Sequence, residues 1–319
     1  MTTATASAPK TTDYSAKIKK GPSQAAPRIV LIGVEGVGKT TAGAQCPEPI
    51  FLCAEDGLVG SGYDNIANYS PANWEDVLGF LSYIAAGNHT YKSLIIDTID
   101  WLEMLLFEYI CKRDSKYHTK DRVASAEMIE NYGYGKGYIV AAAEFRRALV
   151  LLDKIRCGNI LVMINSHSQI KLVDNLEGEN YSRCEPKVCK QIAGLIKEWA
   201  DTVLFAKFEI SASKEKGSAR AKGLGGQTRI VQTQYSAAYD AKNRYGLPVV
   251  MPFDMDEILE AIKRGNPDEP ENIIADINAL LPNLPEDKQT AIKAFVKANK
   301  TNTIKLCQML NKVRALTNE

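Results

Sequence analysis

The sequence predicts an α/β fold built on a mostly parallel central sheet. Short apolar runs at 28–33, 50–54, 93–98 and 160–164 alternate with segments of helical spacing. The runs are almost continuously apolar, which is typical of strands that are buried on both faces. A polar residue follows or ends three of them (Glu55, Asp97 and His167), at the edge where parallel sheets hold their ligands. We therefore expect these three side chains to converge on one crevice.

The first run leads directly into a glycine-rich loop with the pattern G-x-x-x-x-G-K-T. Glycines allow the backbone to turn tightly, so that its N–H groups point into one concavity that suits a polyphosphate. The start of the following helix adds further unpaired N–H groups. Lys39 is expected to reach the β- and γ-phosphates of ATP, and the Thr40 hydroxyl to bind Mg²⁺. The expected ATP-binding residues are Gly33, Gly36, Val37, Gly38, Lys39, Thr40 and Thr41.

The other elements follow from periodicity and from breaker residues. Pro47 and Pro49 end the helix after the loop. The segment 207–244 predicts a pair of strands around a Gly/Lys-rich turn, after a strand at 202–208. Helices are predicted at 74–86, 99–111, 139–155, 192–199 and 254–263.

Composition divides the chain into three parts. Residues 1–26 have few large apolar side chains and predict a flexible arm, residues 27–264 form the α/β domain, and 265–319 form a linker and a small C-terminal helical appendage. No apolar run is long enough to span a bilayer, and the N-terminus has no apolar signal core. The seven cysteines show no C-x-x-C pairing, so we expect reduced thiols and a cytoplasmic location. The net charge of +1 requires neither nucleic acid nor membrane.

The residues that end the strands suit phosphoryl transfer to water, which needs positioning and charge stabilisation. Asp97 suits a Mg²⁺ role, although an Asp before an apolar helix also serves as an N-cap. Glu55 suits the base that orients the attacking water; the alternative is a solvated acid at the end of a strand. His167, with Asn165 and Ser166, suits a γ-phosphate sensor, while a lone histidine is often only structural.

The order of these elements resembles that of the RecA-like P-loop ATPases. In that family a carboxylate ends the strand after the phosphate-loop helix, and residues 51–58, Phe-Leu-Cys-Ala-Glu-Asp-Gly-Leu, are similar to that segment. Asp97 matches the family's Mg²⁺-associated aspartate, and residues 165–167 occupy the place of its strand-end sensor. The resemblance covers residues 28–262 and implies a RecA-like fold, ATP and Mg²⁺ as cofactors, and ATP hydrolysis.

A second segment, Ala-Lys-Asn-Arg-Tyr-Gly at 241–246, resembles the Lys-Asn-Arg-Phe-Gly signature of bacterial RadA proteins and of replicative helicases. In those proteins the lysine and arginine reach the nucleotide of a neighbouring subunit. The resemblance therefore implies that Lys242 and Arg244 act in catalysis and that the protein is a homo-oligomer. Among such families, the chain looks most like phage-encoded ATP-binding proteins of the single-strand annealing class, in the host cytoplasm.

Binding of single-stranded DNA needs cations for the phosphates and aromatic faces for the bases. Two segments combine them and a third is basic only, although each also suits a solvated surface, and no clear counterpart of the family's DNA-binding loops is present. We therefore keep two alternatives: a nucleotide-gated adaptor or helicase loader, and a P-loop kinase, for which no arginine-rich lid is evident. The segments contain Lys171, Tyr181, Arg183 and Lys187; Tyr132, Tyr134, Lys136 and Tyr138; and the residues from Lys214 to Lys222.

Overall fold

The structure is a computed structural model that describes residues 25–55, 58, 62–114, 128–175, 178–213, 222–265, 270–300 and 302–317. The predicted arm, apart from residues 25 and 26, lies outside the described residues. The same holds for residues 214–221 of the predicted basic turn and for most of the linker.

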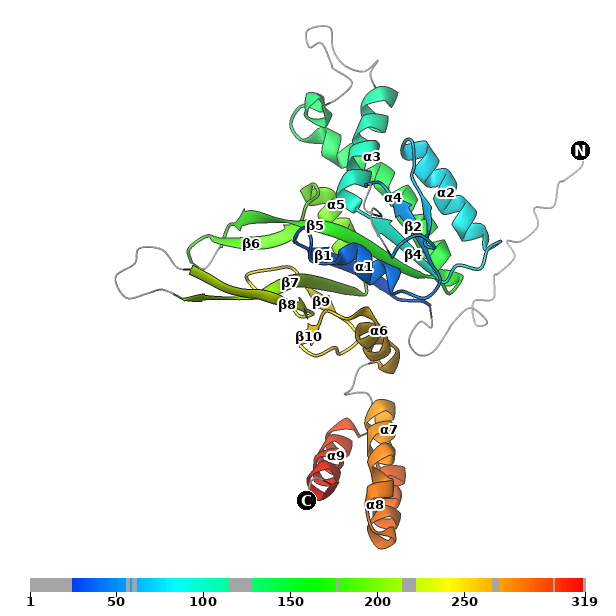
Figure 1. Ribbon diagram of the computed structural model, residues 1–319, viewed down its shortest axis with the longest axis vertical. Helices are drawn as coiled ribbons and strands as arrows, with labels where there is room; N and C mark the ends of the chain where they lie inside the picture. The colour runs from blue at the N-terminus through cyan, green and yellow to red at the C-terminus, as the bar shows by residue number, and fades with distance from the viewer. Residues whose placement is uncertain are drawn as a thin grey trace, which may run out of the picture.

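The core is a sheet in the order β10-β8-β7-β1-β5-β4-β2-β3 (Figure 1). The pairs among β7, β1, β5, β4, β2 and β3 are all parallel, while β8 and β10 extend the sheet in antiparallel fashion. Two further strands, β6 and β9, pair antiparallel with β5 and β7. This confirms the predicted α/β fold with a mostly parallel sheet. The bounds are β1 (Arg28–Gly33), β2 (Pro49–Cys53), β3 (Ala67–Tyr69), β4 (Ser93–Asp97), β5 (Leu161–Val173), β6 (Tyr181–Pro186), β7 (Thr202–Ser213), β8 (Lys222–Gln232), β9 (Lys242–Asn243) and β10 (Val250–Pro252).

Helices cover both faces of the sheet, which explains why its strands are apolar throughout. On β1, Val30 and Ile32 pack into one core with helices α2 to α5, while Ile29 and Leu31 pack into a second core with α1 and α6. Alternate residues of a strand point to opposite faces, so both sets must be apolar. The bounds are α1 (Lys39–Ala44), α2 (Trp74–Ala86), α3 (Ile99–Arg113), the short 3₁₀ helix η3 (Ile129–Tyr132), α4 (Lys136–Cys157), α5 (Lys190–Trp199) and α6 (Met255–Arg264).

Strand β5 is longer than the sequence predicts. The apolar run at 160–164 predicts a short strand followed by a polar loop to about residue 188; this loop prediction is wrong, because β5 continues to Val173 and pairs with β6. His167 therefore lies inside a strand rather than after one. It is the last β5 residue that pairs with β1, opposite Gly33, and the next residue, Ser168, pairs with β6.

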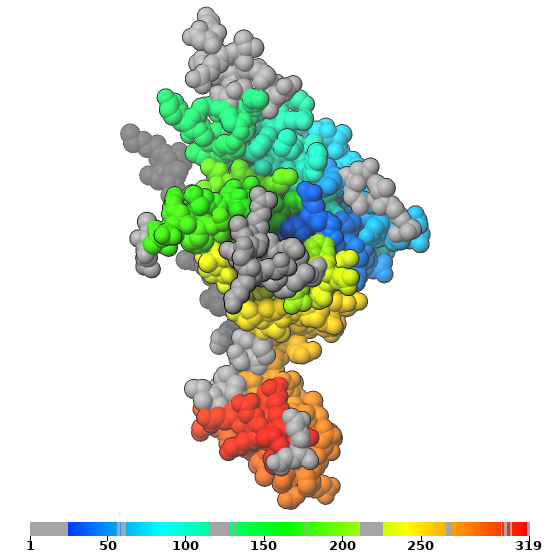
Figure 2. Space-filling view, turned by 60° about the vertical axis from the view of Figure 1, so that its left-hand side comes forward, coloured from blue at the N-terminus to red at the C-terminus, as the bar shows by residue number. Residues whose placement is uncertain are grey.

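The C-terminal helices form a unit with its own core. α7 (Pro270–Leu280), η4 (Leu281–Asn283), α8 (Glu286–Ala298) and α9 (Thr303–Thr317) bury Ile277, Leu306 and their neighbours among themselves. In Figure 2 these helices, coloured orange to red, form a lobe at the lower end of the view. The predicted helical appendage is confirmed. In the described part of the chain, no helix has the length and apolar character needed to cross a membrane.

Candidate functional site

The phosphate loop is a tight turn that depends on its glycines and on a buried valine. A Cβ at Gly33 would lie 2.9 Å from Cγ1 of Val37 and 3.0 Å from the carbonyl oxygen of Ala206, so only glycine fits there. Gly36 and Gly38 have φ angles of 71° and 105°, in the region that favours glycine. Val37 is fully buried and anchors the loop in the core beneath it.

A cavity of about 630 Å³ opens beside this loop. It lies beyond the carboxyl ends of β1, β4 and β2, next to the point where β5 leaves the parallel sheet. The predicted convergence is confirmed, because Glu55, Asp97 and His167 all line this cavity together with the loop. The full set of lining residues is Glu35, Gly36, Gly38, Lys39, Thr40, Thr41, Glu55, Tyr63, Asp97, Thr98, Trp101, His167 and Lys187.

Lys39 is buried at the base of the loop. Its Nζ donates hydrogen bonds to the carbonyl oxygens of Gly33 and Val34, at 3.2 and 3.1 Å. Burial lowers the pKa of Lys39, although carboxylates nearby, with that of Asp97 the most influential, act in the opposite direction. An anion that entered the cavity would favour the charged form of this lysine.

Thr40 and Asp97 present adjacent oxygen atoms to the cavity. Thr40 Oγ1 donates to Asp97 Oδ2 at 2.7 Å, and Asn165 Nδ2 donates to Asp97 Oδ1 at 3.1 Å. Asn165 is fully buried, so it fixes the orientation of Asp97 from below. The N-cap of α3 is Thr98, so Asp97 does not serve as the N-cap of that helix.

A hydroxyl, a carboxylate and the phosphates of a nucleotide are the oxygen ligands that Mg²⁺ prefers. Thr40 and Asp97 therefore fit a Mg²⁺ ion. No cluster of three or more His, Cys, Asp or Glu ligands occurs among the described residues, so most of the ion's ligands would have to be phosphate and water oxygens.

Glu55 is half-buried and held beside the same edge. Its backbone N–H donates to the carbonyl oxygen of Asp97 at 3.3 Å, and its Oε2 accepts a hydrogen bond from Thr98 Oγ1 at 3.2 Å. One carboxylate oxygen remains available to a water molecule in the cavity. This geometry suits a residue that orients water.

His167 is held by Asp100, which the sequence analysis did not identify. The backbone N–H of His167 donates to Asp100 Oδ1 at 3.1 Å, and its Nδ1 lies 2.8 Å from Asp100 Oδ2. Burial opposes ionisation of Asp100, but its bonds to His167 outweigh this effect and the pKa of Asp100 falls below its ordinary value. An ionised Asp100 favours the tautomer that carries its proton on Nδ1, so Nε2 is left as an acceptor.

Other residues at the loop were also not predicted. Tyr63 OH lies 2.9 Å from Thr41 Oγ1, while Trp101 lines the cavity and is 51% exposed. Nη1 of Arg229 would be 2.8 Å from a Cβ at Gly38, so this guanidinium lies against the loop. Arg229 has no ion-pair partner in the described ranges. A single exposed Trp or Arg carries no positional signal in the sequence, so only the fold reveals these neighbours.

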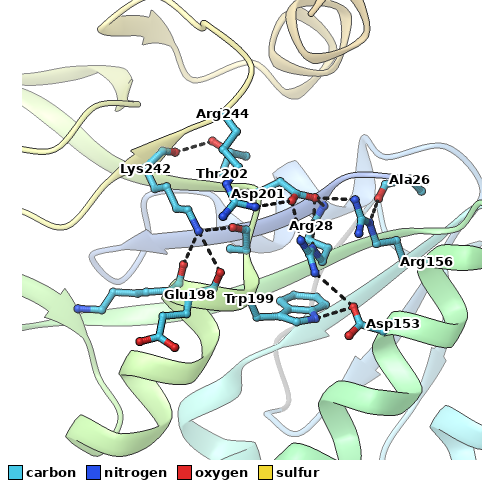
Figure 3. Close-up of polar contacts among 12 residues, drawn as sticks. Ala26, Arg28, Asp153, Arg156, Glu198, Trp199, Asp201, Thr202, Lys242 and Arg244 are labelled. Atoms are coloured by element: carbon cyan, nitrogen blue, oxygen red, sulfur yellow. Dashed lines mark hydrogen bonds and ion pairs between the residues drawn. The ribbon is translucent and has the colours of Figure 1, made fainter. Parts of the chain in front are cut away.

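Lys242 and Arg244 do not reach the cavity. They lie with the amino-terminal ends of β1 and β7, since Lys242 pairs with Val203 and Arg244 contacts Asp201 (Figure 3). Lys242 Nζ donates to three backbone carbonyls at the end of α5, those of residues 197, 198 and 200, at 2.9, 3.0 and 2.6 Å. The lysine thus caps this helix in its own chain, and its role toward a neighbouring subunit stays a prediction.

Asp201 is the centre of this second cluster. Arg28 binds it through Nη2 at 2.7 Å, Arg156 through Nη2 at 3.2 Å and Arg244 through Nη1 at 3.3 Å (Figure 3). Burial opposes ionisation of Asp201, but the contacts with Arg28 prevail and lower its pKa. The cluster joins β1, α4 and the segment after β9 at the edge opposite the phosphate loop.

Comparisons with known proteins found similar solved structures and one family model. Two solved structures have similar regions: the RadB recombinase (13% identity, 65% of this chain and 81% of that chain, TM-score 0.36) and the KaiC-like protein PH0186 of Pyrococcus horikoshii OT3 (13% identity, 65% and 78%, TM-score 0.30). Likenesses this distant carry no functional argument. A comparison with curated proteins gave no match. The AAA_24 family model, described as an AAA domain, matches residues 25–245. The match spans more than half of the 319 residues, so the chain belongs to the AAA_24 family of nucleotide-binding ATPase domains.

Proposed function

We propose that this protein is a Mg²⁺-dependent ATPase that acts on single-stranded DNA, in recombination or annealing of the phage type. The observation that carries the ATPase part is the cavity in which Lys39, Thr40, Asp97, Glu55 and His167 meet beside the glycine loop. ATP hydrolysis needs phosphate binding, charge neutralisation and an oriented water, and these side chains supply groups for each.

The chain's own residues then have separate tasks. The loop N–H groups and Lys39 hold the phosphates, while Thr40 and Asp97 hold Mg²⁺, which when bound would neutralise charge on the phosphate oxygens. The free oxygen of Glu55 orients the attacking water and takes its proton. His167 lines the same cavity, and Asp100 holds its ring in a fixed position there. When both ring nitrogens carry a proton, the Nε2–H donates to an oxygen of the terminal phosphate, and the histidine senses that phosphate through this bond.

The proposal includes a homo-oligomer in which a second molecule supplies an arginine to the cavity; the chain's own Arg229 lies against Gly38 but does not line the cavity. None of the described lining residues is an arginine, and an arginine supplied by a second molecule can stabilise the transition state. Arg244 is the better candidate of the two predicted residues. Its side chain is 54% exposed and has one long ion pair, whereas the ammonium of Lys242 is occupied by three carbonyl oxygens.

The single-stranded DNA part is supported by an aromatic and basic cluster on the hairpins next to the site. The guanidinium of Arg183 lies 5.3 Å from the Tyr181 ring centroid and 4.8 Å from that of Tyr235. The Tyr235 side chain is 64% exposed. Tyr235 thus offers an exposed aromatic face that suits a stacked base, while Arg183, whose side chain is 11% exposed and lies 3.7 Å from Asp240, holds the two rings in place.

The test is ATP turnover with and without single-stranded DNA across a salt series. We expect DNA to stimulate turnover and DNA affinity to fall steeply with salt, through counterion release. Unstimulated turnover at every salt concentration would exclude the DNA part. Phosphorylation of a small molecule would favour the P-loop kinase. Negligible turnover together with binding to a replicative helicase would favour the adaptor or helicase loader.

Mixing variants tests the shared site. Arg244→Ala is expected to bind ATP normally but turn over slowly, and mixing it with Glu55→Gln should restore activity, since each variant supplies what the other lacks. Lys242→Ala is the matched comparison, and we expect it to lower thermal stability as well, because three carbonyls lose their donor. Absence of rescue at every mixing ratio would exclude a site shared between subunits.

A further inference from the structure

The last two helices of the C-terminal lobe carry a run of basic residues that the nucleotide site does not use. Residues 288–318 contain seven Lys or Arg and no Asp or Glu. The described lobe as a whole has these seven cations against four acids, Glu271, Asp276, Glu286 and Asp287, so its net charge is +3. The basic residues are Lys288, Lys293, Lys297, Lys300, Lys305, Lys312 and Arg314.

The structure shows that these cations face solvent. All seven are exposed, and only Arg314 forms an ion pair within the described ranges, with Asp276 at 3.3 Å. Lys293 and Lys297 are one turn apart on the same side of α8, and Lys305 and Lys312 are two turns apart on one side of α9. Six exposed ammonium groups without an ion-pair partner among the described residues make α8, α9 and the turn between them a positive surface, which attracts a polyanion.

We propose that α8 and α9 bind the phosphate backbone of duplex DNA without sequence preference. This would be a second DNA site, separate from any single-stranded DNA contact near the nucleotide. Point charges without exposed aromatic rings suit phosphates rather than bases, since the sole aromatic residue between 270 and 317 is the half-buried Phe295. A duplex carries more phosphate charge per unit length than a single strand, so it gains more from such a surface.

The packing of the lobe argues against the other polyanionic partners. Ile292, Val296 and Leu310 are buried inside the lobe, and among its described residues the large exposed apolar side chain is Leu316, at 39%. Helices that lie on membranes insert an apolar face, and protein interfaces need apolar or aromatic anchors. The lobe offers neither, because its apolar faces already pack against each other.

The experiment measures binding of a fluorescent duplex to the full-length protein without nucleotide, across a salt series. The test variant combines Lys293→Gln, Lys297→Gln and Lys300→Gln, and the control combines Lys112→Gln, Lys154→Gln and Lys190→Gln, which are exposed lysines on the body. We expect the test variant to bind the duplex at least about tenfold more weakly than the wild type. The slope of log affinity against log salt concentration should become shallower by about 3, because each lost phosphate contact contributes about 0.9. The control should bind like the wild type.

Three additional readouts make the result decisive. Lys→Arg at the same three positions keeps the charge and should keep duplex binding, which excludes loss of folding as the cause. The test variant should lose more affinity for the duplex than for a single strand of equal length, because the proposed single-strand contacts lie outside the lobe, and vesicles rich in phosphatidylserine should compete poorly. Equal affinity of test and control variants, or preference for vesicles, would overturn the inference. A lack of DNA-stimulated ATP turnover would not overturn it, because duplex binding is measured without ATP.

Discussion

Asp100 decides how His167 meets the nucleotide cavity. Its two oxygens bind the backbone N–H and the Nδ1 of the histidine, so both the ring orientation and the tautomer depend on it. We predict that Asp100→Asn lowers kcat for ATP about tenfold, equal to about 1.4 kcal/mol of transition-state stabilisation. ATP affinity should change little, because Asp100 does not line the cavity.

Steady-state kinetics over a pH series separate this positioning role from a structural one. The variant should also alter the pH dependence of kcat, because it removes the ionised carboxylate that contacts the His167 ring. A change in KM alone, with an unchanged pH profile, would contradict the assignment.

Of the two loop glycines with a positive φ, Gly38 tolerates substitution less than Gly36. Its φ of 105° strains any side chain, and a Cβ would meet Nη1 of Arg229 at 2.8 Å. Gly36, with a φ of 71°, has no atom within 4 Å of such a Cβ. We predict that Gly38→Ala weakens ATP binding more than Gly36→Ala, each carrying a strain of about 1–3 kcal/mol. Isothermal titration measures both, and the double variant with Arg229→Ala should recover part of the difference. Equal losses in the two glycine variants would show that the Arg229 contact has no effect.

At the scale of the elements, Asp201 stabilises the amino-terminal edge of the sheet. The folded state lowers the pKa of this residue, so the ionised form stabilises the fold. Its contribution is fully present above the unfolded pKa of about 3.9 and is lost as pH falls through the lower folded pKa. We predict that Asp201→Asn costs about 3 kcal/mol at pH 7, because Arg28 and Arg156 lose their buried partner.

Urea unfolding at pH 7 and at pH 3 provides the measurement. The difference between variant and wild type should shrink at the lower pH, as the wild-type carboxylate becomes protonated. A difference that stays constant with pH would show that the cost is steric rather than electrostatic.

At the scale of the whole molecule, the body and the C-terminal lobe have separate hydrophobic cores. No residue of the lobe's core belongs to either core of the body. We predict that a chain ending at residue 265 melts within about 2 °C of the full-length body transition, because it loses no part of its core. Calorimetry of both forms checks this prediction. A drop of about 5 °C or more would mean that the lobe stabilises the body by roughly 1 kcal/mol or more.

Much of this architecture could be predicted from the sequence. Apolar runs with a polar end identified β2 and β4, and helical spacing gave α2 with its observed bounds. The extension of β5 was missed because Ile170 and Leu172 are exposed, so its alternation has no buried face to make it recognisable. Asp100 was missed because an acid in the first turn of a helix has an ordinary explanation in the helix dipole.

The long strand β5 takes part in two sheets. Its first half is clamped between β1 and β4, and its second half is one arm of a projecting hairpin. The changeover comes directly after His167. A molecule bound to the projecting arm would therefore act on the same strand that places His167 at the cavity.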